Sequence, residues 1–212
     1  MIKEQKAMSI IRDRDIREPL FDYLEETYGK IRIIEEKMMG RSRADVVMVT
    51  EDALYGVEIK SDADTYTRLA RQVKDYDKYY DRNLIVAGTK HAHSVKEHVP
   101  EWWGIITVEE EDGRLDFYFY RQPEVNPKLD IKRKISILWR PELAHIQELN
   151  GMPKYRDKSK LFAANKIVDT VSYDILSPQI SEELFQRDYT MIEETLNEYR
   201  KEVTAKKRRR HR

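Results

Sequence analysis

Two acids and a lysine stand in sequence that otherwise has the pattern of buried β-strands. The segment RADVVMVTEDALYGVEIKSD, residues 43–62, carries Asp45 in one apolar run and Glu58 and Lys60 in the next. An ionised side chain inside a packed sheet costs several kcal/mol unless it is paired or bound to a metal. These three residues are therefore the first candidates for a chemical site.

The spacing of the two runs predicts that the three side chains meet. A turn that places Thr50 opposite Ala53 sets the register between them. Asp45 then stands directly across from Glu58, with Cβ atoms about 4.5–5.5 Å apart. Lys60 lies two residues further along and shares that face, because side chains alternate along a strand.

Two adjacent carboxylates repel each other unless a cation lies between them, and oxygen ligands of this number suit Mg²⁺ with waters and phosphate oxygens. A metal that polarises a phosphate, together with the Lys60 ammonium, supplies the parts needed for phosphodiester hydrolysis. The competing interpretation is a salt-bridge cluster with a structural role only.

Hydrophobic periodicity predicts the elements that must hold these residues. A helix with a capping box from Asp15 to Glu18 ends near Gly29. The expected elements that follow are strands at 30–39, 44–49 and 54–61, a helix over 66–80 capped by Asp64 or Thr65, and a strand at 83–88.

The second half of the chain adds a hairpin and helices. A short helix at 94–98 precedes strands at 104–109 and 114–120, joined by an Asp112-Gly113 turn. Helical patterns then cover 135–149, 160–176 and 181–203. We therefore predict the α/β class, with a mixed β-sheet flanked by helices and a helical C-terminal extension.

Composition limits the alternatives. Forty per cent hydrophobic residues suit one main core, and the absence of cysteine excludes disulfides and thiol-ligated metals. No apolar run is long enough to span a membrane and no secretory signal opens the chain, so we expect a cytoplasmic protein without a membrane partner. The motifs of phosphate-loop, nucleophile-elbow, zinc-protease and dinucleotide-binding proteins are absent.

Here the pattern resembles a known family. Asp45 followed by Glu58-Ile59-Lys60 is similar to the signature of the PD-(D/E)XK, or restriction-endonuclease-like, nuclease superfamily. The resemblance implies a restriction-endonuclease-like core over 1–130, with 131–204 as a helical extension packed on it. Ala44 stands where many members have proline. The remaining range, 205–212, is a basic tail that we expect to be disordered.

The resemblance also implies roles for single residues. Asp45 and Glu58 would bind Mg²⁺, with Mn²⁺ as a substitute, and Lys60 would be the catalytic lysine. Gln72 and Tyr76 are similar to the Gln-x-x-x-Tyr motif of RecB-type and lambda-exonuclease-like nucleases. Gln72 would assist catalysis, although an ordinary helix glutamine fits the position equally well.

Further acids and basic residues complete the expected site. Glu18 is a candidate catalytic acid as well as a capping residue, and Glu36 is preferred over Glu35 as a third metal ligand on resemblance. The expected nucleic-acid contacts are Arg43, Ser61, Arg68, Arg71 and Tyr76.

The sequence therefore predicts a Mg²⁺-dependent nuclease that hydrolyses DNA phosphodiester bonds. The alternative is a non-catalytic module that binds nucleic acid or protein on the same fold. A homodimer that places two sites on opposite DNA strands is compatible with the sequence, which does not require it.

Overall fold

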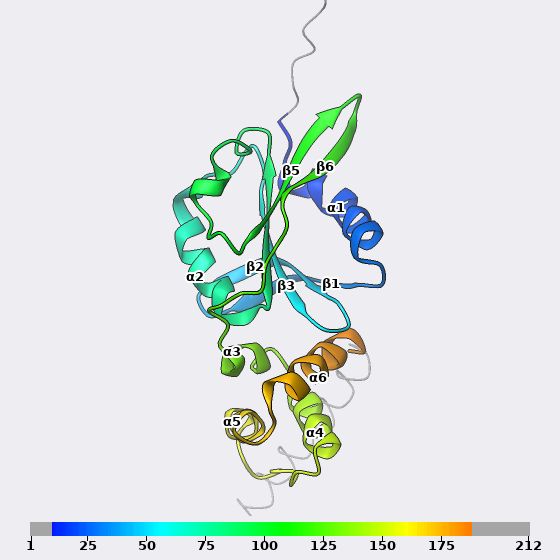
Figure 1. The fold of residues 1–212 in the computed structure, drawn as a ribbon, viewed down its shortest axis with the longest axis vertical. Coiled ribbons are helices and arrows are strands. Elements are labelled where there is room, and N and C mark those ends of the chain that lie inside the picture. The colour runs from blue at the N-terminus through cyan, green and yellow to red at the C-terminus, as the bar shows by residue number, and fades with distance from the viewer. Residues whose placement is uncertain (1–9, 188–212) are drawn as a thin grey trace, which may run out of the picture.

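The computed structural model describes residues 10–187, which form a mixed α/β fold with helices on both faces of a six-stranded sheet (Figure 1). This arrangement confirms the predicted fold class. The elements are α1 (Asp13–Tyr28), β1 (Arg32–Met39), β2 (Ser42–Val49), β3 (Leu54–Lys60), η1 (Tyr66–Arg68), α2 (Leu69–Tyr79), β4 (Arg82–Gly88), η2 (Val95–Glu97), β5 (Gly104–Glu111), β6 (Arg114–Arg121), α3 (Ile131–Ile135), α4 (Arg140–Leu149), α5 (Lys160–Thr170) and α6 (Tyr173–Phe185).

The strands lie in the sheet in chain order, from β1 to β6. Neighbours pair antiparallel at β1–β2, β2–β3 and β5–β6, and parallel at β3–β4 and β4–β5. The crossover from β3 to β4 carries α2, as predicted. Asp112 and Gly113 both have positive φ, 49° and 81°, which is the backbone that a tight Asp-Gly hairpin turn requires.

Helix α1 begins three residues earlier than the sequence predicts. Arg12 is the N-cap, and its backbone N–H donates to Asp15 Oδ2 at 3.1 Å, so Asp15 closes the first turn instead of opening the helix. The predicted capping box from Asp15 to Glu18 is therefore wrong. Pro19 consequently lies in the second turn, where it removes one helical hydrogen bond.

The helix expected from residue 66 begins as the 3₁₀ turn η1 and continues as α2. Thr65 precedes η1 without a side-chain capping bond. Asp64 Oδ2 instead accepts hydrogen bonds from the backbone N–H and the hydroxyl of Ser61, at 3.0 and 2.6 Å. Neither predicted residue caps the helix with its side chain, because Asp64 stabilises the turn that leaves β3.

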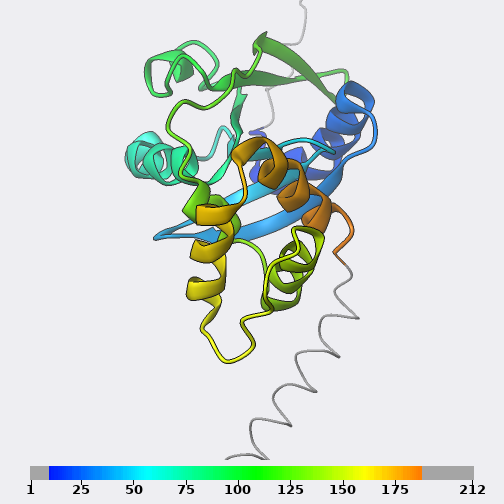
Figure 2. The same cartoon turned by 60° about the horizontal axis from the view of Figure 1, so that its bottom comes forward.

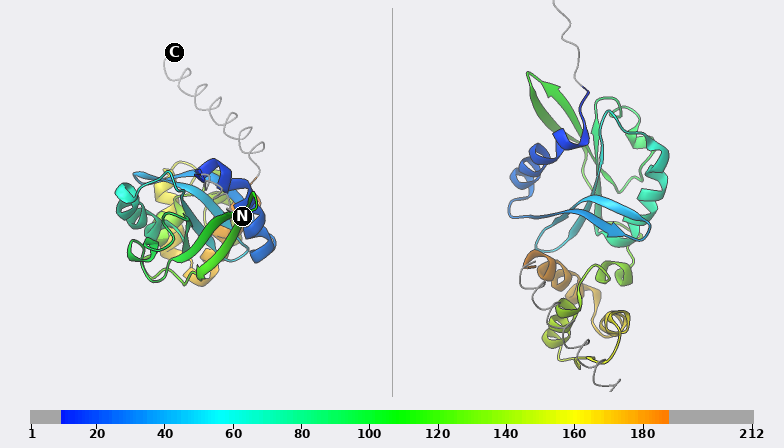
Figure 3. Two further views of the ribbon diagram at one scale, coloured as in Figure 1. Left: turned by 90° about the horizontal axis from the view of Figure 1, so that it is seen from above. Right: turned by 180° about the vertical axis from the view of Figure 1, so that it is seen from behind.

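Alternate residues of β3 face two different hydrophobic clusters. Val57 and Ile59 pack with α1, whereas Leu54 packs with α2 and the C-terminal helices. Seen from behind, α1 and α2 lie on opposite sides of the sheet (Figure 3). The alternation therefore sends Glu58 and Lys60 toward α2.

Gly56 lets α2 approach β3 closely. A Cβ atom at this position would lie 2.2 Å from a ring carbon of Tyr80 and 2.5 Å from a ring carbon of Tyr76. Both distances are shorter than real Cβ contacts allow, so the two rings pack directly against bare backbone.

The C-terminal helices are shorter than predicted, because two residues with extended backbone interrupt them. Trp139 separates α3 from α4 and places Pro141 in the first turn of α4, where proline is tolerated. Val171 ends α5, so the predicted helix over 160–176 divides before α6. Of the helix predicted over 181–203, the structure describes α6 to Phe185, and the rest lies outside the described residues.

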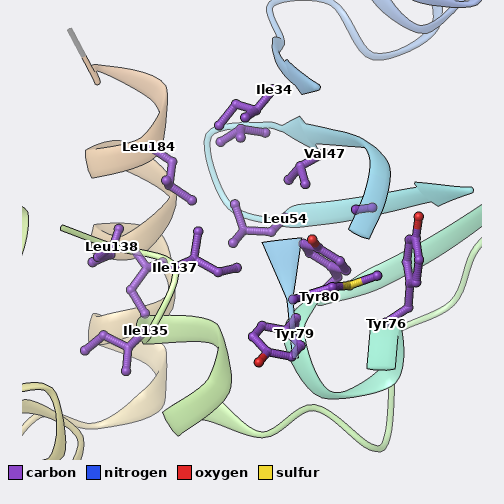
Figure 4. Close-up of a cluster of buried hydrophobic side chains, with 14 of the residues drawn as sticks. Ile34, Val47, Leu54, Tyr76, Tyr79, Tyr80, Ile135, Ile137, Leu138 and Leu184 are labelled. Carbon is purple, nitrogen blue, oxygen red and sulfur yellow. The ribbon is translucent and has the colours of Figure 1, made fainter. Parts of the chain in front are cut away.

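Helices α3 to α6 lie together at one end of the sheet (Figure 2). Ile135, Ile137, Leu138 and Leu184 belong to the same buried cluster as Leu54, and Figure 4 shows the two groups facing each other. The division into ranges 1–130 and 131–204 stays a prediction, and the basic tail over 205–212 lies outside the described residues. Within residues 10–187, no helix is both long enough and apolar enough to cross a membrane.

Candidate active site

Glu58 and Lys60 form a buried ion pair on β3. Lys60 Nζ donates to Glu58 Oε1 at 2.5 Å, and the two residues are 3% and 1% exposed respectively. They reach each other because residues two apart share one face of a strand. The structure thus brings together two of the three residues with which the sequence argument began.

Helix α2 completes the hydrogen bonds of this pair. Gln72 Nε2 donates to Glu58 Oε1 at 2.5 Å, and Lys60 Nζ donates to Gln72 Oε1 at 3.2 Å. Tyr76 lies one helical turn later and donates from its hydroxyl to Glu58 Oε2 at 2.8 Å. The four-residue spacing places both side chains on the helix face that covers β3.

Tyr76 is fully buried, and burial raises the pKa of its phenol well above 10, with the nearby charges of Glu58 and Asp45 adding to the effect. The hydroxyl therefore stays protonated and keeps its donor for Glu58. A side chain with no exposed surface cannot contact DNA, so the nucleic-acid contact predicted for Tyr76 is corrected to a supporting role.

Asp45 leaves the ladder between β2 and β3. The four pairs of this ladder follow the predicted register and end at Val46 with Val57. The next pair, Asp45 with Glu58, is missing. The backbone N–H of Ile59 instead donates to Asp45 Oδ2 at 2.9 Å. A side-chain carboxylate therefore takes the place of a backbone carbonyl as the acceptor.

The ladder with β1 is interrupted at the same place. It runs as far as Glu35 with Val46, resumes at Lys37 with Ala44, and omits Glu36 and Asp45 between them. Glu36 has a φ of 53°, which is uncommon for a residue other than glycine. Backbone strain of this kind costs roughly 1–3 kcal/mol and concentrates at functional sites.

The backbone N–H and C=O of Asp45 form hydrogen bonds with side chains on opposite sides of the sheet. Its N–H donates to the Tyr76 hydroxyl at 3.2 Å, and its C=O accepts from Arg17 Nη1 at 3.3 Å. Tyr76 belongs to α2 and Arg17 to α1, which lie on opposite faces. The two helices together hold Asp45 out of the ladder.

The Asp45 carboxyl is destabilised as an anion. Burial raises its pKa from 3.8 to about 7, and the negative charge of Glu58 adds to the effect, while the Ile59 amide and Lys60 oppose it. The two acids lie near each other, because the Tyr76 hydroxyl bonds to the Asp45 N–H and to the Glu58 carboxylate. A cation beside them would relieve the repulsion.

Arg17 connects this site to two further acids that sequence reasoning missed. Arg17 Nε donates to Asp13 at 2.8 Å, and Arg17 Nη1 donates to Glu35 at 2.9 Å. The four-residue spacing of Asp13 and Arg17 on a helix was the available signal. Glu18, the predicted catalytic acid of α1, is exposed and is not part of this network.

Glu36 does not join the other predicted metal ligands. Its exposed carboxylate accepts from Arg43 Nη1 at 3.0 Å. The left-handed backbone at Glu36 interrupts the alternation of side chains along β1, whereas the preference for Glu36 over Glu35 rested on the family resemblance. Glu35 is the acid connected to Asp45, through Arg17.

The remaining predicted nucleic-acid contacts divide into two groups. Arg43, Arg68 and Arg71 are exposed. Ser61 is 2% exposed and donates to Asp64, so it stabilises the turn after β3 and presents no surface.

Asp45 and Glu58 offer a small ligand set for Mg²⁺. Within residues 10–187, no group of three or more histidines or acids could hold a metal ion by itself. Mg²⁺ is commonly bound by one or two carboxylates together with waters and substrate phosphates, so two acids suffice. Asp45 Oδ1 accepts no hydrogen bond from any described residue. The charges of the site also favour a cation, since its acids Asp13, Glu35, Asp45 and Glu58 outnumber its bases Arg17 and Lys60.

The chain resembles a known protein family in sequence and, over part of its length, a solved structure. A family model described as Bacteriophage P4 protein cII matches residues 6–208. No curated protein matches the chain. A solved structure described as the structure of Pyrococcus furiosus SfsA in complex with Ca²⁺ is similar at 15% identity and a TM-score of 0.32, over 56% of this chain and 63% of that chain. The likeness therefore spans less than two thirds of that protein and carries no argument about activity.

Proposed function

The chain belongs to the bacteriophage P4 protein cII family, and we propose that it is a metal-dependent nuclease that hydrolyses DNA phosphodiester bonds with a PD-(D/E)XK-type site. One observation carries the proposal. Asp45 is held out of both strand ladders, next to the buried Glu58–Lys60 pair, by side chains from two helices. A purely structural ion pair needs no such distortion.

In this proposal Asp45 and Glu58 hold Mg²⁺, for which Mn²⁺ can substitute. When bound, the ion would act as a Lewis acid that polarises the phosphodiester and lowers the pKa of a bound water. The proposal needs no third acid, because substrate phosphate oxygens and waters are normal ligands of Mg²⁺.

Lys60 stabilises negative charge as it develops on the phosphate. Its ammonium is held between Glu58 Oε1 and Gln72 Oε1, at 2.5 and 3.2 Å, so its position is fixed before substrate binds. Fixed donors and charges stabilise a transition state more than mobile ones, because they need no reorganisation.

Gln72 and Tyr76 orient Glu58. They donate to different carboxylate oxygens, Oε1 and Oε2, which fixes the plane of the carboxylate. Tyr76 also accepts the Asp45 N–H, so one hydroxyl positions both proposed metal ligands. We therefore assign both residues a positioning role.

The test compares the parent chain with Asp45→Asn on linear, circular and branched DNA, with Mg²⁺ or with EDTA. We expect cleavage by the parent in Mg²⁺ only, and none by the variant. Asp22→Asn, an exposed residue of α1, is the matched control and should cleave like the parent. Equal cleavage by Asp45→Asn would exclude the proposed site.

A second readout measures metal binding without catalysis. Mg²⁺ that binds the folded chain raises its unfolding temperature by mass action. The increase should be present in the parent and in Asp22→Asn, and absent in Asp45→Asn.

The alternative function is a non-catalytic module that binds nucleic acid or protein. One observation favours it: Glu58 is 1% exposed and both of its oxygens already accept hydrogen bonds. This alternative predicts salt-sensitive DNA binding or protein binding with no cleavage product in Mg²⁺. The same assay therefore separates the two functions.

A further inference from the structure

Positive side chains gather between β1 and the C-terminal helices, away from the ion pairs already described. Lys37 is half-buried on β1, Lys160 is the first residue of α5, and Arg187 follows α6. One acid, Glu142 of α4, lies among them, and its charge acts on both lysines.

Arg187 already neutralises Glu142. Its Nε and Nη2 donate to the two carboxylate oxygens at 2.6 and 2.7 Å, and its guanidinium stacks on the Trp139 ring at 4.6 Å. The backbone N–H of Trp139 also donates to Glu142 Oε2, at 2.5 Å. Arg187 Nη1 is buried and has no hydrogen-bond partner among the described residues. A buried donor left without a partner calls for an explanation, such as a bound water or ion.

Among residues 10–187, the two lysines therefore have no acid of their own. Burial, together with the charges of Arg187 and Lys160, lowers the pKa of Lys37 to about 8 against the opposing effect of Glu142. Lys160 Nζ donates to the Ser136 carbonyl at 2.8 Å, which is a neutral partner. Glu183 is another acid near Glu142, but it is hydrogen-bonded to His145.

The pairing of β1 with β2 links the backbone of this cluster to that of the candidate active site. Lys37 pairs with Ala44 in the β1–β2 ladder, and Ala44 immediately precedes Asp45. The backbone at Lys37 is therefore close to the backbone at Asp45. Lys160 also places its charge at the N-terminal end of an 11-residue helix, where the helix dipole adds positive potential.

We propose that Lys37 and Lys160, supported by the fixed charge of Arg187, form a second phosphate-binding site that contacts the DNA backbone beyond the scissile bond. This inference rests on the proposed action on DNA. Lysine is suited to the task because it binds phosphate as a mobile point charge and imposes no base sequence. The site would therefore position the strand without selecting its sequence.

The test measures binding of a fluorescent duplex oligonucleotide to the full chain in EDTA, at several salt concentrations. The variants are Lys37→Met, Lys160→Met and the double variant. Methionine keeps an unbranched apolar stem and removes the charge. Lys154→Met is the control, because Lys154 pairs on the surface with Glu148 at 2.5 Å.

Each site variant should reduce the slope of log affinity against log salt by about 0.7–0.9, and weaken binding about fivefold to eightfold at about 0.1 M salt. The double variant should show about twice the change in slope, and Lys154→Met should leave the slope unchanged. Circular dichroism confirms that each variant is folded before it is scored.

An unchanged slope in the folded double variant overturns the inference, as does the absence of DNA binding by the parent. The Mg²⁺ cleavage assay separates this failure from failure of the proposed function. Cleavage by the parent with an unchanged slope rejects the second site alone. A reduced slope without cleavage keeps the phosphate site and rejects the nuclease.

Discussion

Two buried acid–lysine pairs serve different ends in this protein. Glu58 and Lys60 lie within one strand, while Asp81, before β4, pairs with Lys134 of α3. Both lysines are almost fully buried, at 3% and 0% exposure, and both acids also accept a tyrosine hydroxyl. Burial and pairing are therefore shared, and neither property marks a functional site.

The surroundings separate the two pairs. Asp81 Oδ2 accepts the Leu54 N–H at 2.7 Å, and Lys134 Nζ also donates to the Ser177 hydroxyl at 2.7 Å. This pair fastens the C-terminal helices to the sheet through partners that are all satisfied. At Glu58, by contrast, a second acid, Asp45, lies close by, and the strand ladders on both sides of Asp45 are interrupted. The unbalanced charge and the distorted backbone distinguish the Glu58–Lys60 pair from the Asp81–Lys134 pair, whose role is structural.

The largest expected difference between the pairs is in catalysis. Lys60→Met should lower DNA cleavage by at least about 10²-fold, because it removes a fixed charge from the developing phosphate anion. Lys134→Met should leave the cleavage rate per folded molecule unchanged. Rates measured at a temperature where both variants are folded check this, and equal losses in the two variants would contradict the division of roles.

Stability should show the opposite pattern. Lys134→Met should lower the free energy of unfolding by about 3–5 kcal/mol, because it leaves Asp81 buried without its cation. Denaturant unfolding measures the loss. Adding Asp81→Asn to the same chain should restore part of it, and no recovery in the double variant would mean that lost packing, not charge, is responsible.

Acidity should stabilise the metal-free protein through Asp45. Its pKa is raised in the folded state, from 3.8 to about 7, so the folded chain binds this proton more tightly than the unfolded chain does. The stability gained is absent above the folded pKa and grows as the pH falls from about 8 toward 4, by up to about 4 kcal/mol. Asp45→Asn should remove this dependence, as unfolding measured across this pH range in EDTA would show. A parent profile no steeper than that of Asp45→Asn would contradict the assignment.

The smallest effect concerns two tyrosines of one buried cluster. Tyr76→Phe should cost about 1–3 kcal/mol of stability, because Glu58 and the Asp45 N–H each lose a partner. Tyr80→Phe should cost almost nothing, since the Tyr80 hydroxyl is buried and has no partner within the described range 10–187. Denaturant unfolding of the two variants provides the measurement, and equal costs would show that the Tyr76 hydroxyl contributes no specific bond.

Alternation and turn position predicted the sheet well. The register between β2 and β3 is confirmed over all four pairs, because a turn at Thr50 and Ala53 leaves a strand no other way to bury its apolar face. The same rule could not foresee that Asp45 leaves the ladder. That break depends on Arg17 and Tyr76, which contact Asp45 only in the folded chain.

Other misses have equally local causes. The preference for Glu36 rested on family resemblance, and neither that resemblance nor periodicity reveals the left-handed φ at this glutamate. The single helix expected over 135–149 failed because an extended Trp139 lets Pro141 begin a new helix. The role of Asp81 and Lys134 escaped notice because 53 residues separate them in the chain.

The absent side chain of Gly56 sets the height at which α2 stands above the sheet. Because the rings of Tyr76 and Tyr80 rest on bare backbone there, a single methyl group would lift the helix away from β3. Gln72 and Tyr76 would rise with it and lose their reach to Glu58. Gly56, which has no side chain, thus controls the orientation of the Glu58 carboxylate. An alanine scan restricted to charged residues would not test this position.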